Sequence, residues 1–337
     1  MTDDSEYSID QEIADVSICA PHVIILGAGA SLAAFPRGDR NGRRLPVMSN
    51  FVEVVGLEET LAKYGIVYSP GDNFEDIYSS LHLTNKPAAN ELTSIIEDYF
   101  SRLELPDEPT IYDHLVLSLR EKDFIATFNW DPFLYQACAR NHRATQMPGV
   151  AYLHGSVAVG FCLKDRRKGR NGARCSICSE IFSSTRLLYP IQEKNYNADP
   201  FVKAEWEGLK VHMKHAMILS IFGYGAPKSD VEAIRLMKEG WGDVDQRSME
   251  QTEIIDIRPE DELEKSWETF IHTHHCEVHD SFYNSWIGKH PRRSCEAAFQ
   301  QYYQAKFIDE NPIPAGLGFA DLYQWISALT NMEGARA

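Results

Sequence analysis

Five short runs of mainly apolar residues predict the buried strands of a parallel sheet. The runs cover residues 22–26, 124–128, 150–153, 216–222 and 253–257. Their side chains are apolar on both faces of the expected strand, which is typical of a sheet that helices cover on each side.

Segments with helical spacing of apolar residues lie between these strands. Residues 90–103 have this spacing, residues 132–141 follow the second strand, and residues 229–239 follow the fourth strand. Ser229 or Asp230 is available as the N-cap of the last of these helices. The alternation of strands and helices predicts an α/β fold with a Rossmann-like, doubly wound parallel sheet.

The spacing of these elements predicts the domain organisation. We interpret the acidic start, residues 1–20, as a flexible tail and residues 21–262 as one nucleotide-binding domain. The gap between the first two strands predicts a helical insertion over about 49–119, and a cysteine-containing insert covers about 160–186. The remaining segment, 263–337, is expected to be mixed or helical and either to cap the sheet or to form an oligomer contact.

Composition and charge narrow the class of protein. The chain has 337 residues, of which 44% are hydrophobic and 24% charged, and its formal net charge is −16. A charge of this sign disfavours binding to nucleic acids or membrane surfaces, because phosphates are repelled. The basic stretch 164–170 is interpreted as a solvated loop rather than a nucleic-acid site.

Other features favour a soluble, cytoplasmic protein. The first twenty residues lack the apolar core of a secretory signal, and the longest apolar run, 216–222, is too short to span a bilayer. The seven cysteines are an odd number, which favours reduced thiols or a metal site over a disulfide framework.

A glycine-rich turn follows the first strand. Residues 27–31 read GAGAS, and glycines at this junction allow a phosphate to approach the backbone at the start of a helix. The alternative is a tight turn without a ligand. A dehydrogenase is disfavoured, since the third glycine of its fingerprint is absent and no strand ending in an acid follows about twenty residues later.

Polar residues follow two further strands. The second strand ends in Asn129 and Asp131, and the third ends in His154. Because ligands collect at the carboxyl ends of parallel strands, these groups and the glycine turn are expected to face one crevice. Alternatively, Asn129 and Asp131 cap a helix and His154 is a buried structural imidazole.

In this order along the chain, these segments resemble the motifs of the Sir2 family, specifically its bacterial Sir2-like branch. Residues 27–31 resemble GAGxS, residues 127–131 resemble TxNxD, and residues 153–156 resemble the segment with the catalytic histidine. Residues 222–225 with Asp230 resemble a GYS-x-D stretch. Tyr189, Pro190 and Lys194 also match that branch, so the resemblance spans about 22–258.

The resemblance implies cleavage of NAD at the bond between nicotinamide and ribose. This reaction passes through an oxocarbenium-like state and releases a neutral amide, so it needs no strong nucleophile. By this resemblance, Asn129 would orient the ribose hydroxyls or the attacking water, and Asp131 would support it by hydrogen bonding. His154 would be the general base, which requires a neutral imidazole near pH 7.

The resemblance also implies a set of residues that bind NAD. Gly27, Ala28, Gly29 and Ser31 would surround the pyrophosphate. The remaining motif residues assigned to binding are Thr127, Gly223, Tyr224 and Asp230. Asp256, at the end of the fifth strand, is interpreted either as a contact to the adenosine ribose or as a structural surface acid.

Three functions remain open at this point. Sir2 deacylases carry a Phe-Gly-Glu-like stretch after the zinc module, which residues 187–194 lack. Water is therefore favoured as the acceptor, and the branch implies an NAD hydrolase that depletes NAD in antiphage defence. An NAD-dependent deacylase and a nucleotide-sensing module without turnover are the alternatives. Because such a hydrolase needs control, we expect a homo-oligomer, a regulatory partner protein or a nucleotide activator.

Two groups of residues suggest metal ligands. Cys162, Cys175 and Cys178 lie where the family has its zinc ribbon, but tetrahedral zinc usually takes four ligands. Asp165 could be the fourth, and reduced loop thiols are the alternative. The run 272–276 with His279 is interpreted as a strand with one packed face rather than a metal site.

Overall fold

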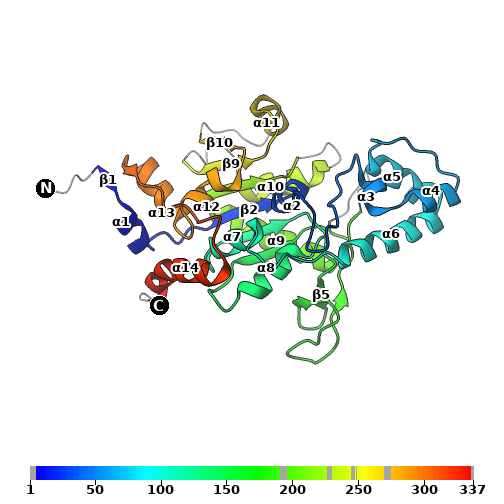
Figure 1. The fold of residues 1–337 in the computed structure, drawn as a ribbon, viewed down its shortest axis with the longest axis horizontal. Coiled ribbons are helices and arrows are strands. Elements are labelled where there is room, and N and C mark those ends of the chain that lie inside the picture. The colour runs from blue at the N-terminus through cyan, green and yellow to red at the C-terminus, as the bar shows by residue number, and fades with distance from the viewer. Residues whose placement is uncertain are drawn as a thin grey trace.

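The computed structural model describes residues 5–189, 196–225, 230–243, 247, 249–268 and 275–334. Its centre is a six-stranded sheet in which every neighbouring pair is parallel (Figure 1). In spatial order the strands are β10 (Cys276–His279), β9 (Gln251–Ile255), β8 (Ile218–Phe222), β2 (His22–Leu26), β3 (Phe124–Thr127) and β4 (Gly149–Tyr152).

This strand order confirms the predicted doubly wound α/β fold. The chain starts in the middle of the sheet with β2, runs outward through β3 and β4, and returns to β8 on the other side of β2. The order of winding therefore reverses between β2 and β8. In sheets of this class that reversal leaves a crevice at the carboxyl ends of the two central strands, where ligands bind.

The apolar runs bury both faces of the sheet. Along β2, Val23 and Ile25 belong to one hydrophobic core, while Ile24 and Leu26 belong to the core on the opposite face. This division follows from the alternation of side chains along a strand. A strand between two cores is apolar at most positions, which explains why the central strands were recognisable from sequence. Among the buried polar exceptions, His22 and Ser220 hydrogen-bond to each other.

Helices cover both faces of the sheet. On one face lie α9 (Pro200–His215) and α10 (Val231–Trp241), which pack against each other. On the other face lie α2 (Ala28–Ala34), α7 (Ile111–Leu117) and α8 (Phe133–Asn141). Asp199 and Pro200 fix the start of α9: the Asp199 carboxylate accepts the N–H groups of Phe201 and Val202, and Pro200 is the first helical residue.

The helical insertion projects from one end of the sheet (Figure 1). It consists of α3 (Phe51–Val55), α4 (Glu58–Lys63), α5 (Phe74–Thr84) and α6 (Lys86–Ser101). Phe51 and Phe74 stack at its centre with ring centroids 4.3 Å apart, and Phe100 joins this group to Trp130 after β3. The insertion is thus anchored next to the carboxyl end of β3.

The cysteine-containing insert is a separate small sheet. Its strands, in spatial order, are β6 (Arg167–Arg170), β5 (Val159–Cys162) and β7 (Ser183–Ser184), and both pairings are antiparallel. Phe182 is buried against Cys162 and Cys175. The insert follows β4 directly and therefore starts at the same sheet edge as His154.

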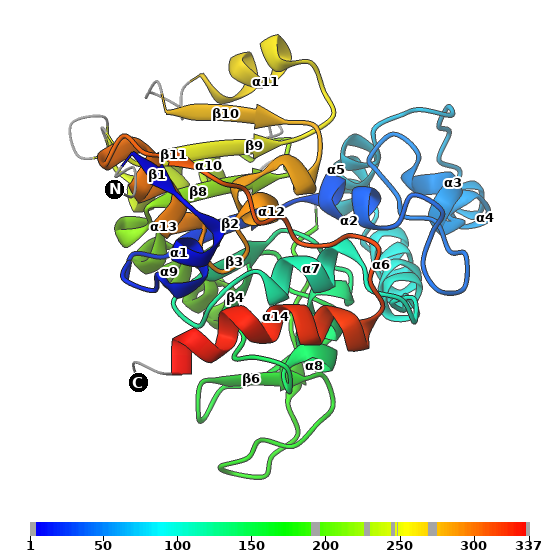
Figure 2. The same ribbon diagram turned by 60° about the vertical axis from the view of Figure 1, so that its left-hand side comes forward.

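The N-terminal segment pairs with and packs on the C-terminal part of the chain. Strand β1 (Glu6–Tyr7) pairs in parallel with β11 (Phe307–Ile308), and α1 (Ile9–Ala14) contacts α14 (Phe319–Gly334) (Figure 2). Tyr7 and Glu12 are both buried. Composition could not predict this packing, because the partners lie about 300 residues away.

The C-terminal segment is mostly helical and packs on the domain. After α11 (Glu260–Trp267) and β10, a 3₁₀ turn (Phe282–Asn284) leads to α12 (Trp286–Lys289) and α13 (Ser294–Ala298). A π-helical turn (Phe299–Tyr303) continues α13. The side chain of Arg293 is fully buried and donates to the carbonyls of Ile13 and Leu329. No helix of the described residues is long and apolar enough to cross a membrane.

Candidate active site at the switch point

Three glycines bring the turns after β2 and β8 into direct contact. The N–H groups of Gly27 and Gly29 donate to the carbonyls of Phe222 and Gly223, each at 2.9 Å. A Cβ atom on Gly223 would lie 2.2 Å from the Ala30 nitrogen, and the φ angle of Gly223 is +63°. Only glycine fits here, so GAGAS and FGYG form one packed junction at the switch point.

A buried hydrogen-bonded cluster connects this junction to the end of β3. The side-chain nitrogen of Asn129 donates to the Gly27 carbonyl at 2.8 Å, to Ser31 Oγ at 3.1 Å and to the Tyr112 hydroxyl at 3.3 Å. The Asn129 backbone N–H donates to Thr127 Oγ1, which fixes the strand end. Three acceptors around the nitrogen hold the amide plane, and Oδ1 remains as the acceptor for a ligand.

The polar hydrogens of this cluster have a defined direction. Ser31 Oγ donates to the Asp131 carboxylate at 2.7 Å, so the Tyr112 hydroxyl, 2.7 Å from Ser31 Oγ, donates to the serine oxygen. Asp131 also accepts the N–H of Phe133. Burial raises the pKa of Asp131 to about 6, although these hydrogen bonds lower it in part. Asp131 therefore titrates close to physiological pH.

His154 lies at the end of β4 in an aromatic environment. Its Nε2 is 2.9 Å from the hydroxyl of Tyr196, and the two rings are stacked at 16°. The rings of Phe128 and His154 are nearly perpendicular, with centroids 4.8 Å apart. Phe128 also stacks on Tyr224, with centroids 4.1 Å apart. The Tyr224 hydroxyl donates to the Asp230 carboxylate at 2.8 Å.

Most residues predicted from the motifs therefore lie at neighbouring strand ends. Asn129, Ser31, Asp131 and Gly27 share one hydrogen-bonded cluster. A second group is connected through Phe128 and contains His154, Tyr224 and Asp230. Ala28 is exposed at the first position of α2, and Gly223 lies in the packed junction.

Other predicted residues lie apart or have a different role. Asp256, at the end of β9, forms an ion pair with Arg258 at 3.0 Å. Asp230 is the N-cap residue of α10, but its side chain makes no capping hydrogen bond and binds Tyr224 instead. Ser229, Pro190 and Lys194 lie outside the described residues, and so do residues 272–274.

Sequence reasoning missed two tyrosines of the site. Tyr112 comes from α7, at the end of the segment predicted as an insertion, and Tyr196 precedes α9. Neither lies in a recognisable motif. The only available sequence signal was the capping box that starts α7 at Thr110, in which the Asp113 side chain accepts the Thr110 N–H at 2.7 Å.

This arrangement combines groups that accept hydrogen bonds with groups that can exchange protons. It provides an amide oxygen, an imidazole and a carboxylate with a raised pKa at one edge of the sheet, beside a glycine-rich helix start. At this site the Ser31 hydroxyl donates to Asp131, so Ser31 is not paired with a histidine that could activate it as a nucleophile.

The cysteine insert places four potential ligands together. One ligand atom from each of Cys162, Asp165, Cys175 and Cys178 lies within 4.8 Å of the others. Cys162 Sγ is 3.6 Å from Cys178 Sγ, and Cys175 Sγ is 3.2 Å from the Asp165 carboxylate. Ligands of tetrahedral zinc with bonds of about 2.3 Å lie roughly 3.8 Å apart, so the group fits that ion.

The electrostatics of this group also favour a cation. The Asp165 carboxylate raises the pKa of the Cys178 thiol to about 12. A divalent cation reverses this effect, because it stabilises thiolates directly. Asp165 therefore lies where a fourth ligand could join the three cysteines.

In the described part of the histidine-rich segment after β9, His279 forms ion pairs. Burial alone lowers the pKa of His279, but contacts to Glu253 and Glu277, each at 3.3 Å, raise it to about 9. His279 is therefore an ion-paired residue of β10. No metal-binding group among the described residues includes Cys276 or His279.

No family model and no curated protein matches this chain. Solved structures similar to it are Sir2 enzymes. A Sir2 homologue in complex with NAD is 12% identical, and the match covers 87% of this chain and 91% of that chain with a TM-score of 0.38.

Two further solved structures are similar to this chain, with comparable sequence identities and TM-scores. A structure described as the structural basis of sirtuin substrate affinity is 12% identical over 77% of this chain and 88% of that one, with a TM-score of 0.39. A structure on the mechanism and regulation of Sir2 enzymes is 13% identical over 88% and 100%, with a TM-score of 0.36. At these low values, the fold assignment rests on the strand order and the site on its geometry.

Proposed function

We propose that this chain is an NAD⁺ hydrolase that releases nicotinamide and ADP-ribose. One observation carries the proposal. The glycine junction, the Asn129 amide and the His154 imidazole lie at the carboxyl ends of adjacent strands beside the switch point. Dinucleotides bind at this position in doubly wound sheets, and the motifs follow the Sir2 order along the chain.

The reaction breaks the bond between ribose C1′ and the pyridinium nitrogen. The electron pair of that bond moves to the nitrogen, which leaves as neutral nicotinamide, and a water oxygen forms the new bond to C1′. Asn129 Oδ1 accepts a hydrogen bond from this water or a ribose hydroxyl, and His154 takes the proton that the water loses. Asp131 holds Ser31 and, through it, the Asn129 amide.

The dinucleotide would lie across the junction of β2 and β8. Ala28 and Ser31 at the start of α2, with Gly27 and Gly29, let the pyrophosphate approach the positive end of the helix. The N–H groups of Gly27 and Gly29 are already bonded to the turn after β8, so their role is close packing and access. Gly223, Tyr224, Thr127 and Asp230 complete this side, and Asp256 would contact the adenosine ribose.

Water is the favoured acceptor over acyl-lysine. Residues 187–194 lack the Phe-Gly-Glu-like stretch of Sir2 deacylases, and the helical insertion packs at the end of β3, beside the expected acceptor side. We place the hydrolase in the cytoplasm as an NAD-depleting effector of antiphage defence, controlled by homo-oligomerisation, a partner protein or a nucleotide. Zinc in the cysteine insert would be structural.

The test is incubation of the purified chain with NAD⁺ in the absence of any peptide, followed by chromatography of nicotinamide and ADP-ribose. His154→Ala and Asn129→Ala are expected to lose at least about 100-fold in rate while remaining folded. The melting temperature of Asn129→Ala should fall, because the variant leaves buried acceptors without their donor. Matched controls are His142→Ala and Asn90→Ala, which replace exposed residues away from the site.

The outcomes separate the alternatives. Nicotinamide release that appears only with an acylated peptide supports a deacylase instead. A stable complex with intact NAD⁺ after long incubation supports a sensing module. Unchanged turnover in both active-site variants contradicts the assignment of Asn129 and His154.

A further inference from the structure

The charge of the chain is divided unevenly between the cysteine insert and the remaining residues. The insert, residues 160–186, contains seven basic and two acidic side chains, so its formal charge is +5. Because the whole chain has a formal charge of −16, the remaining residues carry −21. A positive region on a strongly negative protein attracts surfaces of negative charge.

The basic side chains of the insert face solvent. All seven are exposed, and four of them lie on β6 or just before it, namely Lys164, Arg166, Arg167 and Arg170. Among the described residues, only Lys168 of the seven forms an ion pair, with Glu205 at 2.6 Å. The other six positive charges are therefore not paired with a carboxylate in the described part of the chain.

Apolar side chains are exposed at one end of the same insert. Leu163 is 68% exposed and Ile177 is 61% exposed. Leu163 follows Cys162 and Ile177 precedes Cys178, and the Sγ atoms of these two cysteines are 3.6 Å apart, so both apolar side chains lie near the cysteine cluster. Arginine is enriched in protein interfaces, and exposed apolar groups gain by leaving water there. The combination is therefore typical of a surface that binds another protein.

Helix α11 has a similar combination with the opposite sign of charge. It exposes four carboxylates, those of Glu260, Asp261, Glu262 and Glu264. Its one basic residue, Lys265, lies in the last turn. Ile257, three residues before the helix begins, is 89% exposed. Helix α11 and Ile257 thus offer an acidic surface with an apolar side chain beside it.

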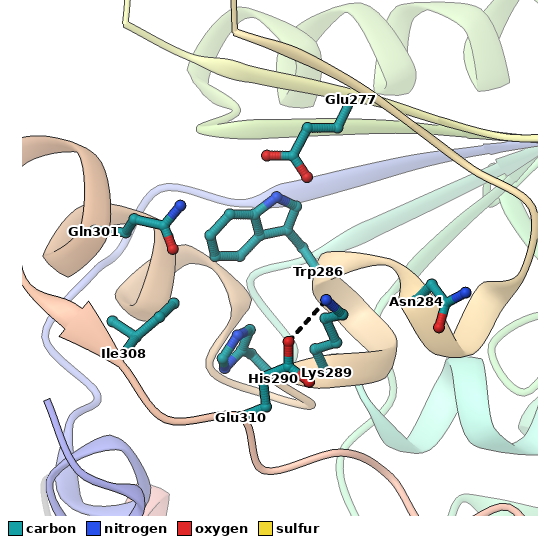
Figure 3. Close-up of a pocket in the computed structure, with 8 residues that line it drawn as sticks. All are labelled: Glu277, Asn284, Trp286, Lys289, His290, Gln301, Ile308 and Glu310. Carbon is teal, nitrogen blue, oxygen red and sulfur yellow. Dashed lines mark ion pairs between the residues drawn. The ribbon is translucent and has the colours of Figure 1, made fainter. Parts of the chain in front are cut away.

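Two other carboxylates near this edge of the sheet line a cavity beside β10 and are already paired. Glu310 is paired with Lys289 at 2.7 Å (Figure 3). Glu277, on β10 itself, lies 3.3 Å from His279. In contrast, the four carboxylates of α11 have no ion-pair partner among the described residues. Uncompensated negative charge at this edge is therefore concentrated on α11.

The insert and α11 lie at opposite edges of the main sheet. The insert follows β4, which is one edge strand, and α11 lies in the chain between β9 and the other edge strand, β10. Both ribbon views place the strands of the insert and α11 on opposite sides of the molecule (Figures 1 and 2). The two surfaces therefore cannot meet within one chain, and a contact between them joins two chains.

We propose that the insert of one chain docks against α11 of a second copy, so that the chains associate head to tail. The arginines of the insert pair with the carboxylates of α11, while Leu163, Ile177 and Ile257 leave water. Because the contact uses two different surfaces, an insert and an α11 remain unoccupied at the two ends, and the assembly grows until a ring closes or continues as a filament. This inference goes beyond the proposed hydrolysis of NAD⁺ and does not depend on it.

A nucleic acid fits the insert less well than a second copy does. The phosphates of a long strand would be repelled by the charge of −21 on the rest of the chain. A second copy brings its own acidic helix to the insert. The docking of opposite charges also offsets, at the contact, the repulsion between two chains of net charge −16.

Sedimentation velocity of the full chain tests the proposal. Between about 1 and 100 µM protein, the chain is expected to associate at roughly 50 mM NaCl and to do so at least about tenfold more weakly at roughly 500 mM NaCl. The insert variant Arg166→Gln/Arg167→Gln and the α11 variant Glu260→Gln/Glu264→Gln should each weaken self-association about tenfold. Their melting temperatures should stay close to that of the unmodified chain, because all four side chains are exposed.

Matched controls separate the two surfaces from net charge. Glu58→Gln/Glu59→Gln on α4 makes the same change of charge as the α11 variant, at two exposed residues of another helix. Arg143→Gln/Lys203→Gln does the same for the insert variant. Both controls should associate like the unmodified chain.

A mixture of the insert variant and the α11 variant tests the head-to-tail geometry. The insert variant keeps its α11, and the α11 variant keeps its insert. An equimolar mixture should therefore form a dimer that retains one unaltered contact and does not grow further.

Several results would overturn the proposal. These are a chain that stays monomeric at low salt, association that neither variant weakens, an equal loss in the controls, and a mixture that associates no better than each variant alone. Tight binding of a single-stranded oligonucleotide that the insert variant loses would assign the insert to nucleic acid instead. Nicotinamide release from NAD⁺ is a separate readout, so failure of the hydrolase proposal is distinguishable.

Discussion

The substitution Asp131→Asn tests whether the cluster under Asn129 contains a buried, ionised carboxylate. The Asp131 carboxylate accepts from Ser31 Oγ with one oxygen and from the Phe133 N–H with the other, so the variant keeps one of these two acceptors. The lost hydrogen bond lowers stability at every pH, whereas the lost titration changes how stability depends on pH. Burial raises the pKa of Asp131 from 3.8 to about 6 in the folded chain.

The sign of the effect follows from proton linkage. Between pH 3.8 and about 6 the folded chain binds more protons at Asp131 than the unfolded chain does, so this group lowers stability as the pH rises through that window. Two pKa units correspond to about 3 kcal/mol in total, of which roughly 1.4 kcal/mol arises between pH 5 and pH 8. The variant lacks this destabilisation, because asparagine does not ionise.

The assay is urea unfolding of both proteins at pH 5 and pH 8. The free energy of unfolding of Asp131→Asn, relative to the unmodified chain, should rise by roughly 1.4 kcal/mol from the lower to the higher pH. Asp107→Asn, at a side chain that is 75% exposed, is the control and should show no such change. A difference that is the same at both pH values would refute the reasoning.

Three further predictions concern other parts of the site. Gly223→Ala should lower the free energy of unfolding by about 2–5 kcal/mol in chemical denaturation, because its Cβ meets the backbone of α2 and its φ is positive; a neutral effect contradicts the packed junction. Tyr196→Phe removes the hydroxyl at His154 and should lower kcat/KM for NAD⁺ about three- to tenfold with little change in melting temperature. Metal analysis should find about one zinc per chain, lost in Cys178→Ser and kept in Cys19→Ser, and equal zinc in both variants argues against the site.

The sheet was largely predictable because its central strands are buried on both faces. The run 22–26 coincides with β2, and the runs at 124–128 and 150–153 match β3 and β4 within a residue or two. The edge strand β10 has no fully buried residue, so it gives no apolar run and was not recognised as a strand of the main sheet. Its neighbour β9 begins two residues earlier than predicted.

The candidate site was predictable only where it follows a strand. Asn129 and His154 were found because each occupies a carboxyl end of a buried strand. Tyr112 and Tyr196 reach the site from helices and connecting segments, and nothing in their local sequence indicates which way they point. The position of a side chain at a site that is built from several elements depends on tertiary packing, which a single sequence does not encode locally.

The pairing of β1 with β11 has a consequence for how the chain folds. Glu6 is opposite Phe307 in this pair, so β1 finds its partner only after the long segment between them has been synthesised. The central strand β2 likewise waits for β8, because His22 is opposite Ile218. Contacts so distant in sequence slow folding. The nascent protein therefore completes its central sheet late, and β1 can pair only after β11 has been synthesised.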